Sequence, residues 1–272
     1  MPRFATTDDV NLHYYDEGRD EGGRAVVLIS GYGASADDWA LQWVALREAG
    51  YRVVSLDRRW AGSSDRPPYG LRMSRGGKDV RELITHLGLE DVLVVGQSMG
   101  ASHVWAYASL FGCDRLAGIV TIDQSPRMVN GAGWGYGFYG LTAENLGTFF
   151  LDPANVLATG HGRPWQDPAE VDAKIRAAGG RGALPDITPD TYPLMFDHAC
   201  QDWRDVVARI TVPALIVAGE QSQFWPPEHA RATADLSPWA RAAVVPGAGH
   251  AAQLDEPAAV NKLLTQFAGS LP

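Results

Sequence analysis

The chain has 272 residues, with 23 basic and 32 acidic side chains that give a formal net charge of −9 at pH 7. This acidic balance argues against nucleic acid, whose phosphates require a basic face, and against a polybasic contact with anionic lipid. The N-terminal residues lack the apolar stretch of a signal peptide, and no apolar run approaches the roughly 20 residues of a membrane span. We therefore expect a cytoplasmic protein that binds neither nucleic acid nor membrane. Its two cysteines, Cys113 and Cys200, form no disulfide framework and no metal motif.

Short apolar runs alternate with helical patterns along most of the chain. The runs are rich in β-branched residues and predict strands at Leu12–Tyr15, Ala25–Ile29, Tyr51–Leu56, Val92–Val95, Leu116–Ile122, Ala214–Ala218 and Arg241–Val245. The patterns between them predict helices at Asp37–Ala49, Ser74–Leu87, Met99–Phe111, Pro227–Leu236 and Glu256–Phe267. Near-continuous apolar strands are typical of a parallel sheet covered on both faces. The sequence therefore predicts an α/β doubly wound sheet.

One long stretch interrupts this alternation. Between residues 127 and 203 there is no strand–helix–strand unit, and a segment of this length is too long for a simple connection. Helical patterns recur within it at Ala143–Phe150, Pro168–Ala178 and Pro189–Ile210. We predict a mostly helical cap at 127–203, set on a core formed by residues 1–126 and 204–272.

The sequence Gly-Gln-Ser-Met-Gly at 96–100 follows one predicted strand and opens the next predicted helix. A G-x-S-x-G turn in this position is typical of a nucleophilic serine. The sharp turn exposes the hydroxyl of Ser98, and the flanking glycines, Gly96 and Gly100, let strand and helix approach closely. The sequence therefore predicts Ser98 as a catalytic nucleophile.

A serine nucleophile needs a general base, and the chain has seven histidines. His250 lies in a glycine-rich loop between the last predicted strand and the terminal helix. Because ligands bind at the carboxyl ends of the strands in open parallel sheets, we predict His250 as the base. We expect His13 and His86 at the surface and His103 facing either helix packing or the cap.

Two carboxylates could orient the imidazole of His250. Asp123 follows the predicted strand Leu116–Ile122, and the chain order of Ser98, Asp123 and His250 is the serine–acid–histidine order of such sheets. Glu220 follows the predicted strand Ala214–Ala218 and is the alternative acid. We favour Asp123.

A second glycine-rich loop, Ser30–Gly33, follows the predicted strand Ala25–Ile29. Backbone N–H groups beside a nucleophile can bind the oxyanion that develops on the substrate. We predict that the N–H groups of Tyr32 and Met99 form this oxyanion hole.

Aromatic residues alternate with glycine in the first part of the insertion, which begins just after Asp123. Glycine allows the backbone to approach the sheet, and aromatic rings then supply an apolar lining. We predict that Trp134, Tyr136 and Phe138 partly line the substrate pocket and that the substrate is bulky and apolar.

Taken together, these motifs resemble the α/β-hydrolase family, and the resemblance spans nearly the whole chain outside the insertion. It rests on residues Ser30–Gly33, Asp57–Ser64, Gly96–Gly100, Ile210–Pro213 and Gly249–His250. The pattern is most similar to cofactor-free haloperoxidase-like esterases and to lactonases. The resemblance implies a mostly parallel eight-stranded sheet flanked by helices, with a helical cap and with no cofactor or metal. In this family the acid often stands where this chain has Ser222, whereas some members carry it after the sixth strand, which supports Asp123.

The sequence thus predicts a serine hydrolase that cleaves a carboxylic ester or lactone of an apolar small molecule. Ser98 would attack the carbonyl, His250 would take its proton, and Asp123 would hold the imidazole. The same three residues could instead perform C–C bond hydrolysis, perhydrolysis or lyase chemistry, and a ligand-binding receptor on this scaffold also stays open. Assembly into a homo-oligomer is left open by the sequence.

Overall fold

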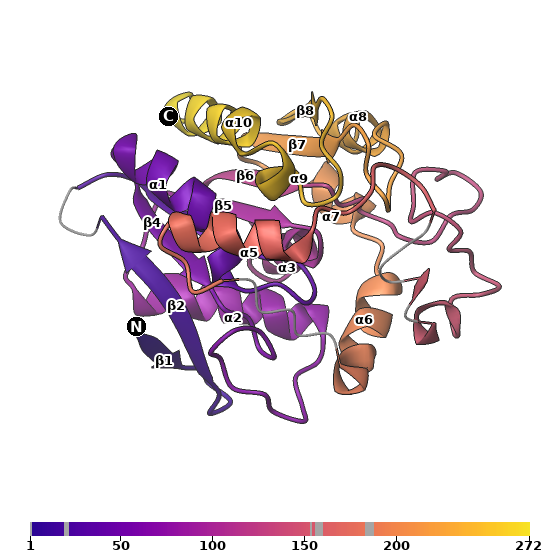
Figure 1. The fold of residues 1–272 in the computed structure, drawn as a ribbon, viewed down its shortest axis with the longest axis horizontal. Coiled ribbons are helices and arrows are strands. Elements are labelled where there is room, and N and C mark those ends of the chain that lie inside the picture. The colour runs from indigo at the N-terminus through magenta and orange to yellow at the C-terminus, as the bar shows by residue number, and fades with distance from the viewer. Residues whose placement is uncertain (1, 19–21, 153, 156–159, 183–187) are drawn as a thin grey trace.

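A sheet lies at the centre of the molecule. The computed structural model describes residues 2–18, 22–152, 154–155, 160–182 and 188–272. Among these residues, eight strands form one sheet in the order β1-β2-β4-β3-β5-β6-β7-β8. The strands are β1 (Arg3–Ala5), β2 (Asn11–Glu17), β3 (Ala25–Ile29), β4 (Arg52–Leu56), β5 (Val92–Gln97), β6 (Leu116–Ile122), β7 (Ala214–Gly219) and β8 (Ala240–Val245). Strand β2 pairs antiparallel with both β1 and β4, and the pairs from β4 to β8 are all parallel. The predicted mostly parallel sheet is confirmed (Figure 1).

Helices cover both faces of this sheet (Figure 1). In chain order, with η for a 3-10 helix, they are η2 (Ala36–Trp39), α1 (Ala40–Glu48), α2 (Met73–His86), α3 (Met99–Phe111), η3 (Phe149–Leu151), α5 (Pro168–Ala177), η4 (Pro189–Thr191), α6 (Tyr192–Ala199), α7 (Arg204–Ala208), α8 (His229–Ala234), α9 (Ala252–Asp255) and α10 (Pro257–Gly269). In the described part of the chain, no helix has both the length and the apolar character needed to cross a membrane.

The two faces of the sheet bury separate apolar clusters. Successive side chains of β3 point to opposite faces, as the two-residue period of a strand requires. Val26 belongs to the cluster that contains Trp43 of α1. Val27 belongs to the cluster that contains Trp105 of α3. Either tryptophan is almost fully buried, so its replacement by alanine would cost about 3–5 kcal/mol of stability.

The insertion is less helical than predicted, because most of its described residues lie outside η3, α5, η4 and α6. Residues 143–150 were expected to be helical, but they form turns that lead into η3. The side chain of Asn145 explains the difference, since it accepts from the N–H of Thr142 at 2.8 Å and donates to the carbonyl of Gly140 at 2.8 Å. An asparagine that bonds to nearby backbone groups in this way competes with helix formation.

The other helical patterns of the insertion form helices, with one interruption. Helix α5 corresponds to the predicted segment Pro168–Ala178. The predicted segment Pro189–Ile210 is divided into η4, α6 and α7, and residues 200–203 between α6 and α7 are not helical. There the chain joins the start of the insertion, because the N–H of Trp203 donates to the carbonyl of Pro126 at 2.8 Å.

The insertion packs against both faces of the core. Met128, Phe138 and Leu194 join the cluster on the α3 side, whereas Ile175 of α5 joins the cluster on the α1 side. Figure 1 shows α5 beside α1 and α6 away from it, with the remaining loops of the insertion on the right of the view. These parts of the insertion border the carboxyl ends of the parallel strands, where the candidate site lies.

Candidate active site

Ser98 lies between β5 and α3 in a strained backbone conformation, with φ of 53° and ψ of −127°. Positive φ is costly for a residue other than glycine and is retained mainly at functional sites. The two neighbouring glycines are sterically required. A Cβ on Gly96 would lie 2.5 Å from the backbone of Gly100, and a Cβ on Gly100 would lie 2.1 Å from the carbonyl oxygen of Ile29. The turn therefore holds Ser98 at the carboxyl end of β5.

His250 follows β8 and is held at its ring and at its backbone. Its Nδ1 lies 2.7 Å from Oδ2 of Asp123. Its N–H donates to Oε1 of Gln223 at 2.8 Å, and its carbonyl accepts from Nε2 of Gln97 at 3.0 Å. Gln97, the residue before Ser98, thus connects the turn of the nucleophile to the histidine loop and fixes the two relative to each other.

The carboxylate of Asp123 is fully buried at the end of β6. Oδ1 accepts from the N–H of Gly219 at 2.9 Å, and Oδ2 accepts from the hydroxyl of Ser222 at 2.6 Å as well as from His250. Burial by itself would raise the pKa of Asp123, but His229 and His250 beside the carboxylate hold its pKa below the usual value. An ionised carboxylate with this set of donors can fix the orientation of the imidazole.

The other candidate acid, Glu220, lies elsewhere. Its side chain is exposed and accepts from the N–H of Gly247 at 2.8 Å. Nδ1 of His250 is already engaged by Asp123. Between the two carboxylates that the sequence left open, the structure brings only Asp123 to the imidazole.

The two N–H groups predicted for the oxyanion hole belong to Met99, which directly follows Ser98, and to Tyr32, which lines the same cavity as Ser98. Met99 is the first residue of α3, so its N–H has no acceptor within the helix. Tyr32 belongs to the loop after β3, and Arg58 binds the carbonyls of Ser30 and Gly31 in that loop, the former at 2.9 Å. The buried guanidinium of Arg58 thereby fixes the backbone on which Tyr32 lies.

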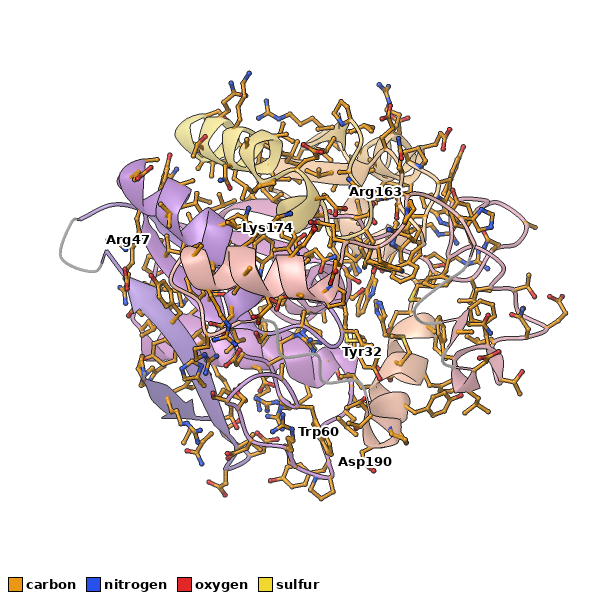
Figure 2. All side chains as sticks on the ribbon, in the orientation of Figure 1. Tyr32, Arg47, Trp60, Arg163, Lys174 and Asp190 are labelled. Atoms are coloured by element: carbon orange, nitrogen blue, oxygen red, sulfur yellow. The ribbon has the colours of Figure 1, made fainter. Side chains whose placement is uncertain are left out.

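The side chain of Tyr32 connects the same loop to the insertion. Its hydroxyl lies 2.6 Å from Oγ1 of Thr191, immediately before α6, and Figure 2 shows Tyr32 next to this helix. Burial raises the pKa of Tyr32 above its ordinary value, so the hydroxyl stays protonated and hydrogen-bonded at neutral pH. A hydrogen bond therefore connects the loop after β3 to the start of α6.

A cavity of about 210 Å³ contains Ser98 and His250 in its wall. The apolar part of the wall consists of Met128, Phe138, Phe150, Met195, Phe224, Trp225 and Leu254. The polar part includes Gln97, Gln124, His198, Asp38 and Gln253. A mostly apolar enclosure with a few polar groups beside a nucleophile and a base is typical of a small-molecule site.

A larger groove of about 620 Å³ shares wall residues with this cavity. The shared residues are Asp38, Trp165, Ala251 and Leu254. The groove continues along the N-terminal end of α5 past Pro168 and Val171. A ligand longer than the cavity therefore has space to extend into the groove.

Comparison with known proteins places this geometry in a family. Residues 24–257 match the family model of the alpha/beta hydrolase fold. The chain belongs to this family. It is similar to a non-heme haloperoxidase from Rhodococcus erythropolis, with 30% identity over 260 residues that cover 92% of this chain and 93% of that protein. It is also similar to a bifunctional esterase/perhydrolase from Acinetobacter calcoaceticus, with 26% identity covering 97% and 98% of the two chains.

Among solved structures, this α/β hydrolase is similar to a bromoperoxidase from Bacillus anthracis. The TM-score is 0.81 at 26% sequence identity, and the alignment covers 99% of this chain and 100% of the other. The similarity extends over the whole length, so the insertion is included in it.

Of the three aromatic residues predicted to line the pocket of the α/β hydrolase, only Phe138 is in the cavity wall. Trp134 is buried elsewhere, with its Nε1 donating to Oγ of Ser125 at 3.0 Å and its ring 5.5 Å from the guanidinium carbon of Arg204. Tyr136 is exposed and packs edge-on against Trp134. The prediction was wrong for Trp134 and Tyr136, because Trp134 packs outside the cavity wall against Ser125 and Arg204, and Tyr136 packs on Trp134.

Several wall residues were not found from the sequence. Trp165 lies in an irregular segment without a motif, yet its ring centroid is 6.3 Å from that of His250. Phe224 lies closer, at 4.4 Å from the same ring, and follows the loop where the family often has its acid. Met195 and His198 are three residues apart on α6, and this spacing was the one signal available for them.

Asp38 was also not predicted as part of the site. Its carboxylate accepts from the N–H of Ser35 at 2.8 Å in a capping box and contributes to the walls of both the cavity and the groove. Burial raises the pKa of Asp38 to about 6. The carboxyl of Asp38, at the boundary between cavity and groove, therefore changes its charge at weakly acidic pH.

Proposed function

We propose that this α/β hydrolase cleaves carboxylic esters or lactones through an acyl-enzyme on Ser98. One observation carries the proposal: the strained Ser98 and the imidazole of His250 border the same cavity, and Asp123 contacts that imidazole at 2.7 Å. A nucleophile, a base and an orienting carboxylate are the three parts that acyl transfer requires.

In the proposed reaction, Oγ of Ser98 attacks the substrate carbonyl while Nε2 of His250 takes the hydroxyl proton. The negative charge on the former carbonyl oxygen is stabilised by the N–H groups of Tyr32 and Met99. His250 then returns the proton to the leaving alcohol, and a water deprotonated by His250 releases the acid from Ser98. Asp123 stays ionised and stabilises the imidazolium in both halves of the reaction.

The proposed substrate is apolar and larger than an acetate ester. Its support is the apolar cavity wall, which includes Phe138, and the adjoining groove of about 620 Å³. We assign residues 127–203 to a cap, because α5 and α6 contribute to the walls of the groove and the cavity respectively. We place the leaving alcohol on the groove side, since the alcohol departs first while the acyl group stays bound to Ser98.

Perhydrolysis is a second candidate, favoured by similarity to proteins named as a haloperoxidase and an esterase/perhydrolase. Here hydrogen peroxide replaces water in the second half-reaction. A peroxide oxygen attacks the acyl carbon, the bond from that carbon to Oγ of Ser98 breaks, and the peroxide proton passes through His250 to Ser98. The product is a peracid, and no redox cofactor is needed for this step.

Steady-state hydrolysis of 4-nitrophenyl esters with acyl groups of increasing size tests the proposal. We expect kcat/KM to rise from acetate to bulkier apolar acyl groups and to fall by about 10⁴-fold or more in Ser98→Ala. Ser109, which is exposed on α3, provides the matched control, and Ser109→Ala should behave like the wild type. Ester turnover by Ser98→Ala near the wild-type rate would contradict the proposal. Peracid formation after addition of hydrogen peroxide distinguishes the second candidate.

A further inference from the structure

His198 is a polar residue in the otherwise apolar wall that α6 contributes to the cavity. Its side chain is 3% exposed, and it lies one helical turn after Met195, which also lines the cavity. The neighbouring wall residues from the insertion, Phe138 and Phe150, carry no hydrogen-bonding group. His198 is therefore placed where a bound molecule, rather than bulk water, would contact it.

The imidazole of His198 is neutral and incompletely hydrogen-bonded. Burial, with the nearby charge of Arg58, lowers the pKa of His198 to about 3. A neutral imidazole has one N–H donor and one acceptor nitrogen. Among the residues that the structure describes, Nδ1 of His198 has no hydrogen-bond partner and almost no accessible surface. Nε2 is not enclosed in this way, so it is the ring nitrogen that a molecule in the cavity can reach. A buried polar group left without a partner is costly, so a ligand that supplies a partner gains affinity.

A second histidine shows that lack of a partner is not enough to indicate a site. His103 is also buried, and neither of its ring nitrogens has a partner in the described part of the chain. It packs against α2, where a Cβ on Gly76 would lie 2.4 Å from Nε2 of His103, and it does not line the cavity. His198 combines the incomplete hydrogen bonding with a place in the cavity wall.

We propose that His198 is a specificity residue that binds an oxygen substituent on the acyl part of the substrate. This inference rests on the proposed hydrolase function and defines its substrate class: esters or lactones whose acyl group carries a hydroxyl or keto oxygen. The acyl part is assigned to this wall because the groove, on the side of Trp165, is the exit for the alcohol. A hydroxyl can donate to and accept from the imidazole, whereas a keto oxygen can only accept.

Three esters with the same 4-nitrophenyl leaving group test the proposal: one with a plain acyl group, one with a hydroxyl and one with a keto oxygen at the same chain length. We expect wild-type kcat/KM to be about tenfold higher for at least one oxygen-bearing ester than for the plain ester, the size of one net hydrogen bond. In His198→Phe this ratio should fall to about one, and in His198→Asn part of it should remain. Met195→Leu, in the same wall, should keep the wild-type ratio.

The outcomes separate the two proposals. Ser98-dependent hydrolysis of all three esters with equal kcat/KM in the wild type would overturn the assignment of His198 and leave the hydrolase function standing. An unchanged ratio in His198→Phe would also overturn the assignment. If none of the esters is hydrolysed in a Ser98-dependent way, the proposed function and the inference that rests on it both fail. Because the readout is a ratio, a general loss of folded protein does not imitate the expected result.

Discussion

Replacing Asp123 by asparagine should remove most of the ester hydrolysis while keeping the fold. The carboxylate accepts from Gly219 on Oδ1 and from Ser222 and His250 on Oδ2. An asparagine has one acceptor oxygen, so its amide nitrogen must face a donor on one of these two sides. If the nitrogen faces His250, the imidazole turns a lone pair toward it and carries its proton on Nε2. That tautomer cannot accept the proton of Ser98.

The expected size of the effect follows from these contacts. The substitution removes the negative charge that stabilises the imidazolium and, where the amide nitrogen faces His250, also the correct tautomer, so kcat should fall by about 10⁴-fold. The same substitution leaves one buried donor unsatisfied, which should cost about 1–3 kcal/mol and lower Tm by several degrees. Asp123→Asn is therefore expected to be folded at 25 °C but nearly inactive.

The assay combines steady-state hydrolysis of a 4-nitrophenyl ester with thermal melting followed by circular dichroism. Glu220→Gln is the matched control, because this exposed carboxylate accepts from Gly247 and does not contact the imidazole. The control should keep kcat within about threefold, since it removes only a surface hydrogen bond. A folded Asp123→Asn with kcat near the wild-type value, or a larger loss in Glu220→Gln, would refute the assignment of the acid.

Three further substitutions test the packing and the electrostatics of the site. Trp134→Ala should cost about 3–5 kcal/mol in a denaturant titration and leave the preference for bulky over small esters unchanged, and a selective rise in KM for bulky esters would contradict this. Asp38→Asn should stabilise the protein above pH 6 but not below pH 4, because the pKa of Asp38 is raised from 3.8 to about 6 and folding then opposes its ionisation. A difference in Tm between variant and wild type that does not vary with pH would show that the pKa of Asp38 is not raised in the folded protein. Gly100→Ala should destabilise by more than 1–3 kcal/mol, since the new Cβ would lie 2.1 Å from the carbonyl oxygen of Ile29, and wild-type stability would show that the close approach is absent.

Most of the sheet could be predicted because its central strands are buried on both faces. Largely apolar runs such as Ala25–Ile29 and Leu116–Ile122 correspond to β3 and β6 with the same boundaries. The edge strand β1, with three residues and an exposed–buried–exposed pattern, has too few apolar positions to be recognised. Helix α9 has only four residues and was missed for the same reason.

The predicted nucleophile, base and acid come together because each follows a strand of one parallel sheet. Strand ends fix these positions locally, so the motif around Ser98 and the loops of Asp123 and His250 could be interpreted without a structure. The surface position expected for His13 was wrong: it is buried, with Nδ1 2.7 Å from Oδ2 of Asp57. That pair joins residues far apart in the sequence, and the polar pattern of β2 gave no sign of it.

The cavity wall could be predicted least, because contacts between distant segments determine it. Glycine and aromatic residues alternate evenly from Trp134 to Phe138, yet only Phe138 reaches the cavity. Its ring stacks on that of Phe224 at 4.9 Å, and Phe224 follows β7, far along the chain. No pattern within either segment contains this information.

Covalent labelling of Ser98 tests the central claim most directly. An aryl phosphonate ester reacts with an activated serine and gives a stable adduct, and mass spectrometry of proteolytic peptides locates it. We predict one adduct per chain, on Ser98, formed with loss of activity and slowed by orders of magnitude in Asp123→Asn and in His250→Ala. An enzyme that hydrolyses esters at the full rate with Ser98 unmodified, or labelling that proceeds equally fast without Asp123 and His250, would contradict the account.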